Sequence, residues 1–141
     1  MHRLRLRHAQ NAHGMPTLDD FAAMGRKAYD DLPAPFHGAI GDVTVGVADL
    51  PEDDVLAELG LSSPYELLGL FTGIGIAQDG GTSYTGRQPN RIWLYRLPIL
   101  AYWAENDDTL QAIVSHVLIH EIGHHFGLSD DDMERIEAEA G

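Results

Sequence analysis

The sequence predicts a single α+β domain, with helices near both ends and short strands between them. The chain has 141 residues, which is enough for one small domain with a modest core. Alternating valines at 43, 45 and 47 are typical of a strand, because β-branched side chains favour extended backbone. Apolar residues cover most of the circumference of a helix over 109–126, which predicts that this helix is central and buried.

Residues 1–16 differ in composition from the segment that follows them. They contain histidines and arginines without an apolar period and without the spacing of a metal site. We expect them to form a disordered N-terminal extension with no role in a functional site. Residues 17–141 then form the single folded domain.

The composition excludes several classes of protein. A formal net charge of −13 argues against binding to nucleic acid or to anionic membrane surfaces. No apolar run approaches the roughly 18 residues of a membrane span, and no secretory signal is recognisable, so we expect a cytoplasmic protein. The chain has no cysteine, so any bound metal must be held by His, Asp or Glu.

The N-terminal half contains three predicted elements. Residues 18–32 form an amphipathic helix with Thr17 as its N-cap, and the prolines that follow end it. The strand at residues 43–47 comes next. Residues 52–59 form one short helix, which Gly60 stops.

The middle of the chain is harder to assign. The apolar segment 64–71 is compatible with either a helix or a turn, whereas Ile74 and Ile76 indicate a second, short strand. Residues 79–89 are rich in glycine and polar residues, which is typical of a loop or a wide hairpin connection. Residues 91–96 alternate between aliphatic and aromatic side chains, which predicts a strand covered on both faces. Pro98 is expected to end that strand, with a helical turn from Ile99 to Glu105.

The last turns of the helix over 109–126 carry an unusual set of polar residues. His120 and His124 are four residues apart, so both lie on one face, with Glu121 beside them. Two imidazoles one turn apart and an adjacent carboxylate form the helical half of a zinc-hydrolase site. Burying these groups without partners would be costly, and a metal ion satisfies them directly.

A catalytic zinc ion needs a third protein ligand from outside this helix. Gly127 can adopt the left-handed conformation that ends the helix and turns the chain back. Asp130 then follows six residues after His124, at the offset where metzincin-like enzymes place their third ligand. We therefore predict zinc on His120, His124 and Asp130, with Glu121 as the general base that activates a water molecule.

Alternatives remain for the third ligand. Asp130 also reads as a first-turn acid of a last helix that is capped by Ser129, a role that needs no metal. Glu134, Glu137 and Glu139 compete with it, as in enzymes whose third ligand is a glutamate on a later helix.

Other polar residues have weaker assignments. His125 points about 100° away from His124, so we place it at the surface or behind the ligands. His116 lies one turn before His120 and either borders the cleft or is a core histidine. Tyr84, Tyr95 and Arg96 are candidates for the oxyanion stabiliser by residue type alone.

The segment from His120 to Asp132 resembles the short bacterial zincin-like metallopeptidase family. Looser similarity begins at Leu18 and includes residues 67–73 and 92–96. The resemblance implies a minimal zincin fold, in which a small mixed sheet packs on the active-site helix and one strand can pair with a substrate backbone. It also implies the zinc ligands and the base named above.

Two functions follow from this resemblance. The first is a zinc-dependent metallopeptidase that acts on peptides or unfolded proteins. The second is a zinc-stabilised binding or regulatory module with little or no peptidase activity. Eleven residues follow Asp130, which leaves no room for the Met-turn of full-size metzincins and motivates the second hypothesis. Zinc hydrolysis of a non-peptide amide is a third possibility.

Overall fold

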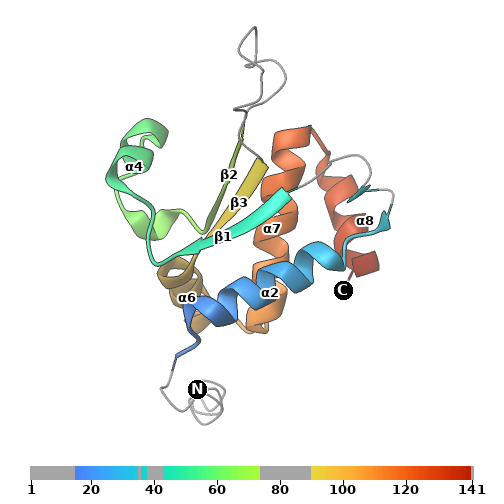
Figure 1. The fold of residues 1–141 in the computed structure, drawn as a ribbon, viewed down its shortest axis with the longest axis horizontal. Coiled ribbons are helices and arrows are strands. Elements are labelled where there is room, and N and C mark those ends of the chain that lie inside the picture. The colour runs from blue at the N-terminus through green and yellow to red at the C-terminus, as the bar shows by residue number, and fades with distance from the viewer. Residues whose placement is uncertain (1–14, 35, 38–42, 74–89, 141) are drawn as a thin grey trace, which may run out of the picture.

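The fold is that of a computed structural model, shown in Figure 1. It describes residues 15–34, 36–37, 43–73 and 90–140. The strand predicted at Ile74 and Ile76 and the loop over 79–89 lie outside the described residues, as do residues 1–14.

Three strands form one mixed sheet in the order β1-β3-β2. The central strand β3 (Asn90–Tyr95) pairs in parallel with β1 (Val43–Ala48) and antiparallel with β2 (Gly69–Thr72). The segment 64–71, which the sequence left unassigned, divides into a 3₁₀ turn, η1 (Pro64–Glu66), and the start of β2. Strand β2 lies at an edge of this sheet, beside the central helix.

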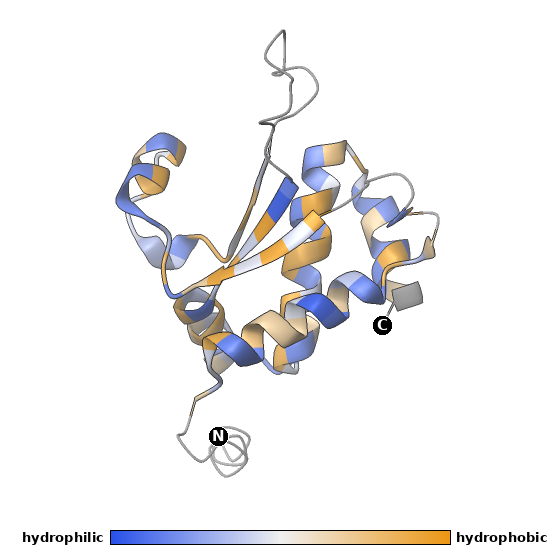
Figure 2. Ribbon diagram, in the orientation of Figure 1, coloured by the Kyte–Doolittle hydropathy of each residue, from blue (hydrophilic) through white to orange (hydrophobic). Residues whose placement is uncertain are grey.

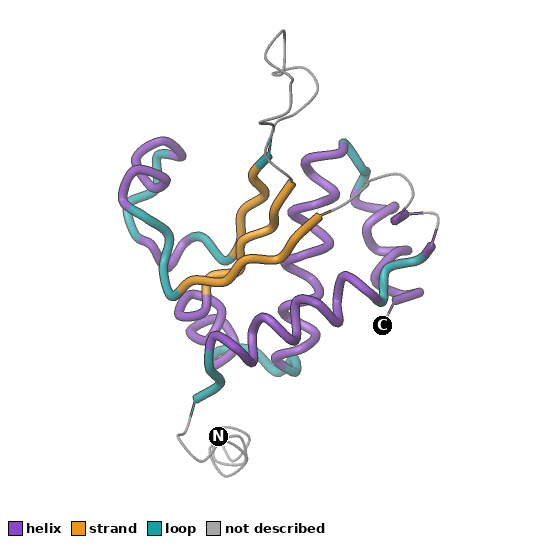
Figure 3. Tube along the Cα trace, viewed as in Figure 1, coloured by secondary structure: helices purple, strands orange, loops and turns teal. Residues whose placement is uncertain are grey.

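Two helices, α2 and α7, pack against each other and against the sheet (Figure 1). Helix α4 lies on the opposite side of the sheet from α7 and α8, and Figure 3 shows the three strands between them. None of the described helices has the length and apolar character needed for a membrane span. The helix bounds are α2 (Leu18–Asp30), α4 (Asp53–Leu59), α6 (Arg96–Ala104), α7 (Leu110–Phe126) and α8 (Asp130–Ala140).

The core forms where β3 meets α7. Ile92 and Leu94 of β3 are fully buried together with Val114 and Leu118 of α7 and Phe21 of α2. Figure 2 shows that α7 is hydrophobic over most of its middle, as expected for a central helix. The predicted α+β class, with a small mixed sheet on a central helix and flanking helices, is therefore confirmed.

Two element boundaries differ from those expected. Helix α6 begins at Arg96, immediately after β3, because proline is tolerated in the first turn of a helix and Pro98 does not delay it. At the N-terminal side, Met15 packs against the core, and the Pro16 carbonyl accepts a hydrogen bond of 2.8 Å from Arg96 Nε. Met15 and Pro16, which the sequence places in the N-terminal extension, thus contact the described domain.

Candidate metal centre

Helix α7 starts and ends where its sequence predicts. The Thr109 hydroxyl accepts a hydrogen bond of 3.1 Å from the Ala112 backbone, which caps the N-terminus. At the other end Gly127 has φ = 75°, and the Leu128 N–H donates to the Gly123 carbonyl over 2.8 Å. This left-handed cap, predicted from the glycine, turns the chain into α8.

Helix α8 is capped by Ser129 and returns to pack against α7. The Asp132 N–H donates to Ser129 Oγ over 3.0 Å, and the Ser129 N–H donates to the Asp132 carboxylate over 3.3 Å. Met133 is fully buried, and a Cβ added at Gly123 would lie 2.8 Å from its Cγ. The glycine within the histidine motif therefore allows the two helices to approach closely.

Glu121 points towards the edge strand β2. The Phe71 backbone N–H donates a hydrogen bond to its carboxylate, and burial raises the pKa of Glu121 above its ordinary value, although this hydrogen bond and nearby His124 oppose the shift. Strand β2 can lie this close because a Cβ at Gly69 would be 2.6 Å from Val117 Cγ1 and 3.0 Å from the Trp93 carbonyl oxygen. The Glu121 carboxylate is thus partly shielded from water by the edge of the sheet.

The Phe71 side chain packs on His125, the histidine that directly follows His124 in the motif. Its ring stacks on His125 with a centroid distance of 3.9 Å and an angle of 22° between the planes. His125 is exposed, so it lies at the surface, which is one of the two positions expected for it.

His120 lies between two other histidines. Its ring centroid is 3.9 Å from that of His116 and 6.0 Å from that of His124. Burial lowers the pKa of His120, and the charge of His116 contributes in the same direction. Its Nε2 atom is buried and has no hydrogen-bond partner among the described residues. A buried ring nitrogen without a partner is costly, and it fits a metal ligand.

Glu137 of α8 faces two of these histidines. Its carboxylate lies 2.7 Å from His116 Nδ1 and 3.6 Å from His120 Nε2. The ligand atoms of all three residues are within 4.8 Å of one another, and within the described ranges this is the group that could hold a metal ion. Two features of the sequence pointed to this group. His116 and His120 are four residues apart, and Glu137 is one of the glutamates that compete with Asp130 as the third ligand.

The structure brings only part of the predicted ligand set together. His124 is exposed but close enough to lower the pKa of both His120 and Glu121 by its charge. Asp130 is the exposed first residue of α8 and makes no hydrogen bond or ion pair with any residue that the structure describes. Neither His124 nor Asp130 belongs to the group within 4.8 Å, so their role as ligands stays a prediction.

A comparison with protein families gives this geometry a context. The family model described as zincin-like metallopeptidase matches residues 40–140, which include all three strands and both α7 and α8. This chain belongs to the zincin-like metallopeptidase family. No curated protein matches the sequence. The family implies a metal ion, and the buried His120 Nε2, which lacks a hydrogen bond within the described part of the chain, fits one.

The structure describes two of the three residues that the sequence suggested as oxyanion stabilisers in this zincin-like protein. Tyr95 is buried, and burial raises the pKa of its hydroxyl, with the charges of Glu52 and Glu121 acting in the same direction. Arg96 donates instead to Asp49 over 3.0 Å and to the Pro16 carbonyl. Tyr84 lies outside the described residues.

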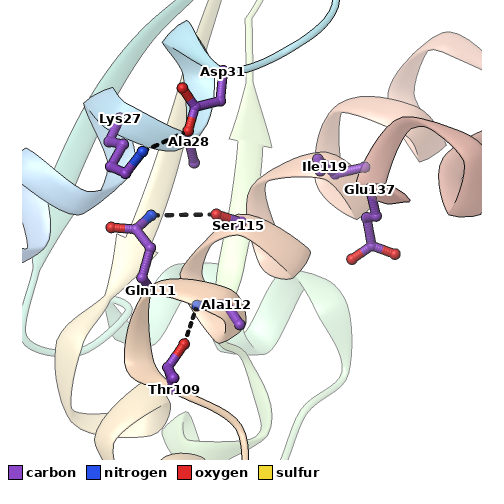
Figure 4. Close-up of a pocket in the computed structure, with 9 residues that line it drawn as sticks. All are labelled: Lys27, Ala28, Asp31, Thr109, Gln111, Ala112, Ser115, Ile119 and Glu137. Atoms are coloured by element: carbon purple, nitrogen blue, oxygen red, sulfur yellow. Dashed lines mark hydrogen bonds and ion pairs between the residues drawn. The ribbon is translucent and has the colours of Figure 1, made fainter. Parts of the chain in front are cut away.

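A pocket of about 380 Å³ lies beside α7 in this zincin-like protein (Figure 4). Its wall includes the Lys27–Asp31 ion pair of 2.8 Å and the 3.2 Å hydrogen bond from Gln111 to Ser115. Glu137 contributes to the same wall, so this residue borders both the pocket and the two histidines.

Proposed function

We propose that this zincin-like chain is a zinc-dependent metallopeptidase that hydrolyses peptide bonds in peptides or unfolded proteins. Glu121 is the general base, and His120, His124 and Asp130 hold the zinc ion. The observation that carries the proposal is the half-buried Glu121 carboxylate next to a histidine whose buried Nε2 has no hydrogen-bond partner among the described residues. This pairing of an acid with an unsatisfied ligand nitrogen is what metal-assisted hydrolysis requires.

Three donors are available for zinc at this end of α7. His120 and His124 are one helical turn apart, which is the usual spacing of a histidine pair in zincins. Asp132, rather than Asp130, forms the capping contact with Ser129, so the Asp130 carboxylate is free to act as a ligand. When bound, zinc acidifies a water molecule and polarises the carbonyl group of the substrate.

Glu121 is suited to move the proton. Its carboxylate accepts the proton of the attacking water and then donates it to the nitrogen of the departing amine. Burial raises its pKa above the ordinary value, which makes it a stronger base than an exposed glutamate. The hydrogen bond from the Phe71 N–H fixes the direction of the carboxylate beside α7.

Strand β2 offers a place for the substrate backbone. Among the described strands it pairs only with β3, and its other edge lies next to α7 and Glu121. An extended peptide can add to such an edge through main-chain hydrogen bonds. This mode selects unfolded segments, since a folded substrate has no free strand to pair.

The test is the substitution Glu121→Gln in the full chain. Loss of the base should lower kcat/KM for a library of unstructured peptides by about 10²–10⁴-fold, while the bound zinc measured by elemental analysis stays the same. The matched control is Glu58→Gln, an exposed carboxylate on α4, which should leave both quantities unchanged. Full activity in Glu121→Gln would refute the proposed base.

A second candidate is a zinc-stabilised binding module with little peptidase activity. It is favoured by the exposure of His124 and Asp130, since catalytic groups usually work in sites that exclude water. If chelation unfolds the protein and the zinc-loaded chain cleaves no member of the peptide library, this function replaces the first.

A further inference from the structure

Three histidines of α7 lie on successive turns of the helix, with His120 in the middle. His116, His120 and His124 are spaced by four residues, and each step rotates by about 40° around the helix axis. His116 and His124 therefore flank His120 on opposite sides. They are separated by roughly 12 Å along the axis, which is too far for one ion to contact both. His120 can form a chelating pair with either neighbour, but the pairs serve different ions.

The side chains converge more closely on the His116 side. The ring centroids of His116 and His120 are 3.9 Å apart, compared with 6.0 Å for His120 and His124. Glu137 completes the first pair from α8, and all three ligand atoms lie within 4.8 Å of one another. Two imidazoles and one carboxylate form a donor set that binds zinc and related dications.

An ion pair alone does not account for this arrangement. Glu137 Oε2 contacts His116 Nδ1 at 2.7 Å, which satisfies one oxygen of the carboxylate. The other oxygen, Oε1, lies 3.6 Å from His120 Nε2, too far for a hydrogen bond, and this buried nitrogen has no hydrogen-bond partner among the described residues. A metal ion between the two atoms would satisfy both of them at once.

We infer that His116, His120 and Glu137 form a second transition-metal site, which shares His120 with the proposed catalytic set. An ion bound there links α8 to α7 and takes the imidazole away from His124 and Asp130, so the two sites compete. The competition depends on the proposed function, whereas the binding itself does not. Excess zinc should therefore inhibit the peptidase by filling the second site.

The pocket beside α7 gives this second site its own access. Glu137 forms part of the pocket wall and lies at its α8 side (Figure 4). His116 is also open to water, with 58% of its side chain exposed. An ion can thus reach Glu137 and His116 without passing between Glu121 and β2.

The experiment removes the proposed catalytic ligands and asks whether binding persists. The metal-free full chain with His124→Asn and Asp130→Asn is titrated with Co²⁺, followed by calorimetry and by the visible absorption of the bound ion. We expect one Co²⁺ per chain. Adding Glu137→Gln or His116→Asn should weaken this binding by at least about 100-fold, since even the loss of a supporting contact costs 10–100-fold. The matched addition of Glu58→Gln, an exposed carboxylate on α4, should have no effect.

The outcomes separate the second site from the catalytic one. Absence of Co²⁺ binding in the His124→Asn/Asp130→Asn protein, or binding that neither Glu137→Gln nor His116→Asn weakens, would overturn the second site. Equal affinity in the wild type and the double variant would instead exclude His124 and Asp130 as ligands and leave the second site standing. Circular dichroism identifies any variant that fails to fold, and the exposed His116→Asn then provides the test.

Discussion

Glu121 and Glu137 both lie close to the histidines of α7, but different parts of the fold hold them there. Glu121 follows His120 directly in the sequence, and its carboxylate is partly buried against the backbone of β2. Glu137 comes from α8, and its two oxygens face His116 and His120. One carboxylate thus faces the edge of the sheet, and the other faces imidazole nitrogens.

This difference separates two kinds of chemistry. A carboxylate beside a backbone N–H of β2, which among the described strands pairs only with β3, is placed to act on a substrate. A carboxylate between two ring nitrogens is placed to bind a cation. The first position depends on close contact between α7 and β2 at Gly69, and the second on close contact between α7 and α8 at Gly123. Substitutions can therefore disturb the two sides separately.

The largest effect is expected from His120→Ala, because this residue belongs to both the proposed catalytic zinc site and the second metal site. Its loss should remove stoichiometric zinc from the purified chain and lower kcat/KM by more than about 100-fold. Elemental analysis and a peptide-cleavage assay measure the two effects. His37→Ala is the control, since His37 contacts Tyr29 instead of the α7 histidines. Zinc retained at one ion per chain in His120→Ala would contradict both proposed sites.

The next largest effect concerns the contact between α7 and α8. Met133→Ala should lower the free energy of unfolding by about 2–5 kcal/mol, because it opens a cavity at a fully buried side chain. Gly123→Ala should cost about 1–3 kcal/mol, because the new Cβ would be too close to Met133. Urea unfolding measures both variants, with circular dichroism as the signal.

The double variant tests whether the two residues act together. If the Gly123 substitution is harmful because of Met133, the combined cost should be smaller than the sum of the single costs. Additive costs would show that Gly123→Ala acts through some other contact.

The parts of the fold that depend on local sequence could be predicted. The helix expected over 18–32 is observed as Leu18–Asp30, and the one over 109–126 as Leu110–Phe126, because amphipathic spacing and capping residues are encoded within each segment. Strand β2 (Gly69–Thr72) could not be assigned, because its four residues become a strand through pairing with β3. Such pairing is a long-range property that periodicity does not contain.

The same division applies to the candidate site. The proximity of His120, Glu121 and His124 follows from helical spacing, and the left-handed cap at Gly127 is confirmed. The approach of Glu137 to His116 depends on how α8 packs on α7 through Met133, which no local pattern reveals. The assignment of Asp130 as a ligand stays a prediction, and Glu139 lacks a described side chain.

A smaller effect is expected from Gly69→Ala on the substrate side. The added methyl group would meet Val117 and the Trp93 carbonyl, which should push β2 away from α7 and cost about 1–3 kcal/mol of stability. Because Glu121 is held by the Phe71 N–H on that strand, kcat should fall while zinc content stays unchanged. Steady-state kinetics and elemental analysis test this. Zinc loss with unchanged kcat would mean that the contact between α7 and β2 supports the metal site and not the catalytic Glu121.

The smallest effect comes from a matched pair of glycines. Gly60 and Gly127 have φ values of 73° and 75°, and a Cβ at either position would meet no atom within 4 Å. Alanine should therefore cost each helix end about 1–2 kcal/mol through the left-handed backbone alone. Gly60 ends α4, on the far side of the sheet, whereas Gly127 sets the direction of α8 relative to α7. Gly60→Ala and Gly127→Ala should thus lose the same amount of stability. Only Gly127→Ala should lower the affinity of the second metal site for Co²⁺. Equal affinity in both variants would show that the packing of Met133, and not the turn, positions α8.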